Sequence, residues 1–61
     1  MKVIKNVDDL QSHWSYLLVK PTGAAVVGEW SPKYGQFIVG ELYDGFDFEN
    51  FSQVWELGYD E

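Results

Sequence analysis

The sequence lacks cysteine and arginine, and it contains a single histidine. Without cysteine the chain can form no disulfide, no thiolate metal site and no cysteine nucleophile. Catalysis that needs a histidine pair or an arginine clamp is excluded as well. These absences predict a protein that is not an enzyme.

Long apolar segments are also missing. No apolar run approaches about 18 residues, the length at which a transmembrane helix is expected. Met1 and Lys2 are not followed by the apolar stretch of a signal peptide. The sequence therefore predicts a cytoplasmic protein that makes no membrane contact.

Basic residues are absent from the second half of the chain. Residues 1–33 contain four lysines and three carboxylates, whereas residues 34–61 contain seven carboxylates and no basic residue. The net charge of −6 thus belongs to the second half. Because phosphate contacts come from Lys and Arg side chains, direct binding to nucleic acid is not expected.

The sequence does contain a high proportion of apolar side chains. The 61 residues are enough for one small domain, residues 1–61. A chain of this size buries only about 60% of the surface that it exposes when unfolded, so its core must be dense. The hydrophobic content of 46%, with 18% aromatic residues, can supply such a core.

The N-terminal third shows a helical pattern. Val7, Leu10 and Trp14 recur at helical spacing, and Asn6 precedes them as a potential N-cap. The spacing predicts a short helix over residues 7–14.

The middle of the chain has the composition of strands separated by turns. Pro and Gly residues punctuate it at residues 21–23 and 31–35, which predicts two hairpin connections. The strands expected from this pattern, with a short edge strand at the N-terminus, cover residues 1–5, 15–20, 24–30 and 36–43. These strands are apolar at successive positions, so helices are expected to cover one sheet face and a partner the other.

The last segment, residues 47–57, fits two patterns. As a helix it would have Asp47 as N-cap and would bring Phe48, Phe51 and Trp55 to one face. As a strand it would place Phe51 and Trp55 on one face with other alternate residues. The fold class predicted is therefore α+β: a three- to four-stranded antiparallel β-meander with a short N-terminal helix and, in one of the two interpretations, a C-terminal helix.

The acidic and aromatic C-terminal stretch is the candidate site. Its carboxylates could imitate the phosphates of a nucleic acid, and nearby aromatic side chains could anchor an interface. The candidate partner-binding residues are Glu41, Asp44, Phe46, Asp47, Phe48, Glu49, Glu56, Tyr59 and Asp60. The function expected is that of a small acidic inhibitor that occupies the basic, nucleic-acid-binding site of another protein by DNA mimicry, as a phage-encoded product would.

An alternative function follows from the apolar strands. The domain could assemble with itself through its sheet face as a homodimer, and the acidic half would then only keep it soluble. Neither interpretation calls for a cofactor. A metal site is not expected either, because the spacing of Asp44, Asp47, Glu49 and Asn50 does not match a calcium-binding loop.

Overall fold

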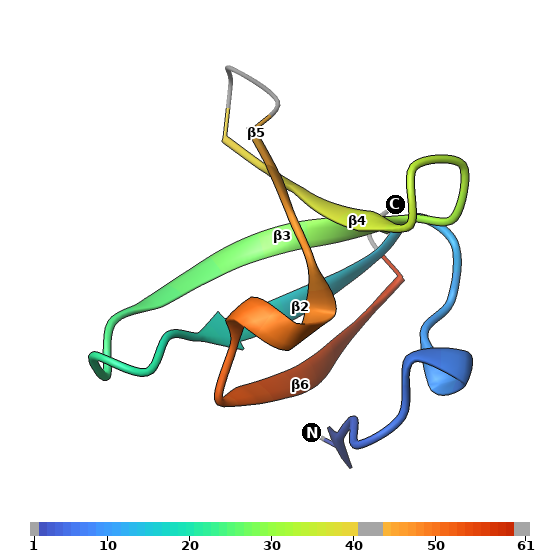
Figure 1. Ribbon diagram of the computed structural model, residues 1–61. Coiled ribbons are helices and arrows are strands. Elements are labelled where there is room, and N and C mark those ends of the chain that lie inside the picture. Colours follow the sequence, from blue (N-terminus) through green and yellow to red (C-terminus); the bar gives the residue numbers. More distant parts are fainter. Residues whose placement is uncertain (1, 41–43, 60–61) are drawn as a thin grey trace.

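The protein, seen in a computed structural model that describes residues 2–40 and 44–59, is built on one antiparallel sheet (Figure 1). The described residues form six strands: β1 (Lys2–Val3), β2 (Trp14–Val19), β3 (Ala25–Ser31), β4 (Gln36–Val39), β5 (Asp44–Phe46) and β6 (Gln53–Tyr59). Their order across the sheet is β1-β6-β2-β3-β4-β5. Strands β2 to β5 thus form a meander, and β6 returns to lie between β1 and β2.

The α+β prediction is wrong, because no α-helix is present among the described residues. Their only helical elements are two 3-10 turns, η1 (Val7–Asp9) and η2 (Phe48–Asn50). The sheet also has more strands than the three or four expected. No helix in the described part of the chain is both long enough and apolar enough to span a membrane.

The helix predicted over residues 7–14 stops after one turn. Its N-cap is confirmed, since Asn6 Oδ1 accepts a hydrogen bond from the Asp8 backbone N–H at 2.9 Å. Beyond this turn, however, Trp14 begins β2 and pairs with Tyr59 of β6. A helix this short gains little stability from its own hydrogen bonds, so pairing within the sheet determines the backbone at Trp14.

The strand interpretation of the last segment is correct only from Gln53 onward. Asp47 does precede a helical turn, but its side chain makes no capping bond and the turn is only η2. From Gln53 onward the chain is extended and pairs on both sides, with β1 and with β2. These two sets of backbone hydrogen bonds override the helical spacing of the aromatic residues.

The short N-terminal edge strand and the two hairpin connections are confirmed. Strand β1 lies at the sheet edge, paired only with β6. In the first hairpin, Lys20 N–H donates to Ala24 O at 2.7 Å and Gly23 adopts a positive φ of 95°. The last predicted strand is shorter than expected, since β4 ends at Val39, and residues 41–43 lie outside the described residues.

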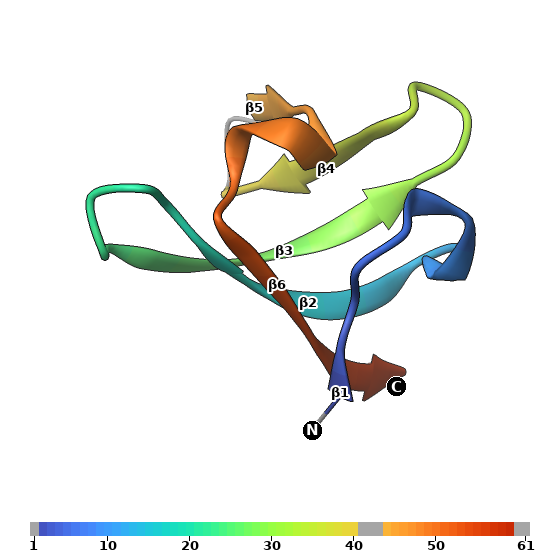
Figure 2. The same cartoon turned by 60° about the horizontal axis from the view of Figure 1, so that its bottom comes forward.

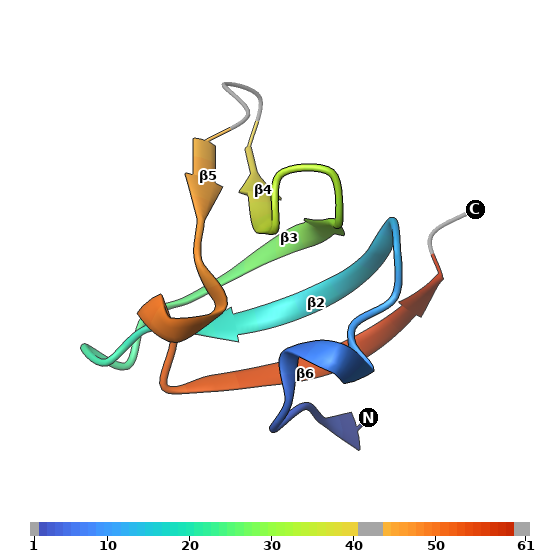
Figure 3. The same ribbon diagram turned by 45° about the vertical axis from the view of Figure 1, so that its right-hand side comes forward.

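The core lies on the concave face of a strongly curved sheet. Strand β5 runs nearly across the direction of β6 (Figures 2 and 3). The curvature encloses a cluster of buried side chains from five segments of the chain: Ile4, Tyr16, Leu18, Trp30, Phe37 and Val54. Phe37 is at its centre, with its ring 5.0 Å from Trp30 and 5.8 Å from Tyr16 between centroids. Aromatic packing thus takes the place of the expected helical cover.

Candidate protein-binding surface

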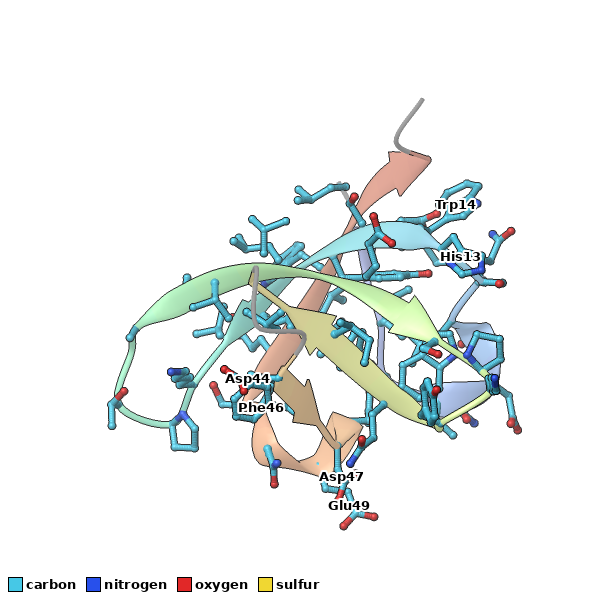
Figure 4. The ribbon with its side chains drawn as sticks, turned by 90° about the horizontal axis from the view of Figure 1, so that it is seen from above. His13, Trp14, Asp44, Phe46, Asp47 and Glu49 are labelled. Carbon is cyan, nitrogen blue, oxygen red and sulfur yellow. The ribbon has the colours of Figure 1, made fainter. Side chains whose placement is uncertain are left out.

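Three exposed carboxylates follow one another along the chain from β5 into η2. They belong to Asp44, Asp47 and Glu49, and we call this group the acidic edge. Strand β5 is the last strand of the sheet, so this edge lies at the sheet boundary. Figure 4 shows Asp44 beside Phe46, with Asp47 and Glu49 farther along, and His13 and Trp14 on the other side of the molecule.

Aromatic side chains hold the acidic edge against the core. Phe46 pairs with Phe37 in the β4–β5 register and lies edge-on to Phe51, with 6.1 Å between ring centroids. Phe48 stacks on Phe37 at 6.3 Å. Both Phe46 and Phe48 are half-buried, so they fix the backbone and leave only part of each ring accessible to a partner.

The carboxylates of the acidic edge are not neutralised by lysine. Asp47 Oδ1 accepts a hydrogen bond from Gln36 Nε2 at 3.0 Å, which fixes the position of that carboxylate. Lys5 lines the same hollow of about 420 Å³ as Asp47 and Glu49. Even so, no ion pair joins any lysine of the described residues to the acidic edge. The three negative charges therefore remain available to an external cation.

The remaining candidate residues do not join this group within the described part of the chain. Glu56 lies on β6 in register with Lys2 and Tyr16, and three strands separate β6 from β5 in the sheet. Of Tyr59 the structure describes only the backbone, which pairs with Trp14. Glu41 and Asp60 lie outside the described residues.

The geometry of the acidic edge does not resemble a metal site. No group of three His, Asp or Glu side chains in the described ranges lies close enough to hold a metal ion. Asp44 lies in β5, whereas Asp47 lies beyond the end of that strand and precedes η2. The arrangement can attract and hold cationic groups at the sheet boundary.

The outer, convex face carries a second surface, which the sequence indicated only through apolar residues at successive positions of the expected strands. The register aligns four apolar side chains across neighbouring strands, in the order Val3, Trp55, Leu17 and Val27. We call them the apolar row. Val27 is 55% exposed and the other three are half-buried. Among the strand residues of the outer face only Glu29 carries a charge, so this face is poorly adapted to water.

A second hollow lies on the same outer face, over β4 and β5. It has a volume of about 500 Å³ and is lined by Tyr34, Gln36, Ile38 and Gly45. We call it the outer hollow. Its residues lie in one turn and two strands, so no local sequence pattern could have grouped them.

Comparison with known proteins gives no family for this chain. No protein-family model, no curated protein and no solved structure matches it. Its function must therefore be argued from its own surfaces.

Proposed function

We propose that this protein is a non-enzymatic protein-binding domain that inhibits a nucleic-acid-binding protein by occupying its basic site. The observation that supports this proposal is the acidic edge, whose three exposed carboxylates form no ion pair with the described lysines. A basic groove that normally binds phosphates attracts such a surface, and long-range attraction accelerates the encounter. A phage or mobile element that blocks a host enzyme is the setting we propose.

The mode of competition that we propose depends on charge rather than on even spacing. A strand presents carboxylates two residues apart on one face at about 6.6 Å, close to the phosphate spacing of one strand of nucleic acid. Asp44 and Asp47 lie three residues apart, and Asp47 lies outside the strand, so they do not form such a row. DNA mimicry here would consist of exposed negative charges along the sheet boundary that replace phosphates at one part of the groove.

Affinity capture from a bacterial lysate tests this proposal. The tagged chain should retain a nucleic-acid-binding protein at about 0.1 M salt and release it at about 0.5 M, where the Debye length is about 4 Å. The double variant D47K/E49K should lose this capture, because it reverses the charge of the acidic edge.

The double variant D8K/D9K is the matched control. Asp8 and Asp9 are also exposed and also border a 3-10 turn, and their replacement changes the net charge equally. It should keep most of the capture. Equal loss of capture in both variants would show that only net charge matters. Equal retention of capture would show that the acidic edge is not the binding surface. Circular dichroism checks that both variants are folded.

A second candidate function, self-assembly, is favoured by the apolar row. The solvated face of an antiparallel sheet normally carries polar residues, whereas here four strands align Val3, Trp55, Leu17 and Val27 on it. A homodimer that packs two such faces together would remove these side chains from water.

Light scattering of the purified chain distinguishes the two candidates. Self-assembly predicts a dimer in the absence of any partner and a monomer for Val27→Lys. Val7→Lys is the control, because Val7 is 43% exposed but lies in η1 rather than on the outer face. A parent chain that stays monomeric at about 1 mM, where even weak dimers form, would exclude self-assembly through this face.

A further inference from the structure

The outer hollow combines an apolar floor with room for a long side chain. Ile38 and Gly45 face each other in the β4–β5 register, and the Tyr34 ring is 65% exposed beside them. Glycine at position 45 makes room for the Gln36 side chain, because a Cβ there would meet Gln36 Oε1. The volume of about 500 Å³ is ample for one extended side chain.

One side of this hollow lies next to a carboxylate. Gln36, which lines it, donates its Nε2 hydrogen to Asp47 Oδ1 at 3.0 Å. This bond connects the outer hollow to the acidic edge. The second carboxylate oxygen of Asp47 makes no hydrogen bond within the described residues, so it can still accept one.

The aromatic side of the hollow already attracts a cation of the protein itself. Lys33 Nζ lies 5.4 Å from the centroid of the Tyr34 ring, within the range of about 6 Å for a cation–π contact. Because Tyr34 is exposed, a cationic group from outside can reach the same ring.

We propose that the outer hollow binds one arginine side chain of the basic partner, with its methylene stem against Ile38 and its guanidinium toward Tyr34 and Asp47. This inference rests on the proposed function, since the partner's basic site supplies the arginine. Arginine suits the hollow better than lysine because its planar guanidinium is more weakly hydrated and stacks on an aromatic ring while it donates to a carboxylate.

Titration of the isotope-labelled full chain with capped peptides tests the inference. The probes are Gly-Arg-Gly and Gly-Lys-Gly, followed by the backbone amide signals of Tyr34, Ile38 and Gly45. The arginine peptide should shift these signals saturably and bind at least about threefold more tightly than the lysine peptide, a difference typical of cation–π and bidentate contacts.

Matched variants distinguish specific binding in the outer hollow from general electrostatic attraction to the acidic protein. Tyr34→Ala and Asp47→Asn should each weaken arginine binding about fivefold or more, whereas Tyr34→Phe, which keeps the ring, and Glu49→Gln, which lies outside the hollow, should have small effects. Lys33→Gln should strengthen binding, because the competing ammonium is gone, and Lys20→Gln should not.

Two results would overturn the inference. One is the absence of any saturable shift at the hollow. The other is that both peptides bind with equal affinity and that Asp47→Asn and Glu49→Gln weaken arginine binding to the same extent. In either case a protein captured through the acidic edge would still support the proposed function, and the two conclusions remain separable.

Discussion

At the scale of single residues, the backbone of His13 is unusual. Its φ of 63° lies in the left-handed region, which no other described non-glycine residue adopts. Its N–H donates to Trp30 O at 3.0 Å, which holds the chain in this conformation before β2 begins. Because the His13 side chain is exposed, its conformation should cost stability without offering packing in return.

The left-handed backbone at His13 therefore predicts whether a substitution raises or lowers the stability of the protein. His13→Gly should stabilise the protein by about 0.5 kcal/mol, since glycine tolerates positive φ but has more freedom to lose on folding. His13→Val should destabilise it by about 1–2 kcal/mol, because β-branched residues are strained there. Urea unfolding measures both. Equal stability of the two variants would mean that the left-handed conformation is not maintained in solution.

Tyr16 is the buried residue with a perturbed acidity. Burial of the ring raises its pKa above the ordinary value of 10.0; the backbone hydrogen bond from Gln11 lowers it in part, and the charge of Glu56 raises it. The folded protein therefore holds the phenolic proton more tightly than the unfolded chain does. Its contribution to stability is complete below pH 10 and is lost as the pH rises from there through the folded-state pKa.

Tyr16→Phe tests this linkage. The variant loses the hydrogen bond from Gln11 N–H to the Tyr16 hydroxyl, 2.8 Å long, so it should be less stable at neutral pH by about 1 kcal/mol. The difference from the parent should shrink above about pH 10, where the unfolded tyrosine ionises. Tyr34→Phe, at an exposed ring, is the control. A constant difference over this pH range would contradict the assignment.

At the scale of elements, the local sequence predicted where segments end better than it predicted whether they are helices or strands. The turns after β2 and β3 follow from Pro and Gly positions, which restrict φ directly. The type of the segments around η1 and β6 depends on pairing with strands more than 30 residues away, such as Trp14 with Tyr59. The acidic edge was foreseeable as a run of carboxylates, but the separation of Glu56 from it required the strand order.

The contact between β3 and its neighbours gives a prediction about packing. A Cβ at Gly28 would lie 2.9 Å from Val39 Cγ2 and 3.0 Å from Ile38 O. Backbone on β4 cannot move aside cheaply, so Gly28→Ala should destabilise the protein by about 1–3 kcal/mol. Gly45→Ala should cost less, because only the flexible Gln36 side chain must move. Thermal unfolding of both variants checks the order, and the reverse order would mean that β3 and β4 are farther apart.

At the scale of the whole molecule, the two candidate surfaces are compatible. The acidic edge lies at the β5 boundary of the sheet, while the apolar row crosses β1, β6, β2 and β3. A dimer formed through the row would leave the carboxylates exposed. Self-assembly and capture of a basic partner can therefore coexist, and only the variants specific to each surface separate them.

The uneven charge of the chain leads to a prediction about salt. The carboxylates of residues 34–61 have no basic neighbour in sequence, and the acidic edge forms no ion pair with the described lysines. Their mutual repulsion opposes folding, and salt screens it. Raising the salt concentration from about 0.02 M to about 0.5 M, where the Debye length falls from about 20 to about 4 Å, should raise Tm by a few degrees.

The same charge-reversal variants show where this repulsion originates. D47K/E49K should respond to salt less than the parent, because the cluster of like charges is broken. D8K/D9K changes the net charge equally but leaves the acidic edge intact, so it should keep more of the parental response than D47K/E49K does. An identical rise of Tm in all three proteins would mean that salt acts through apolar burial instead, and the acidic half would then impose no electrostatic cost on folding.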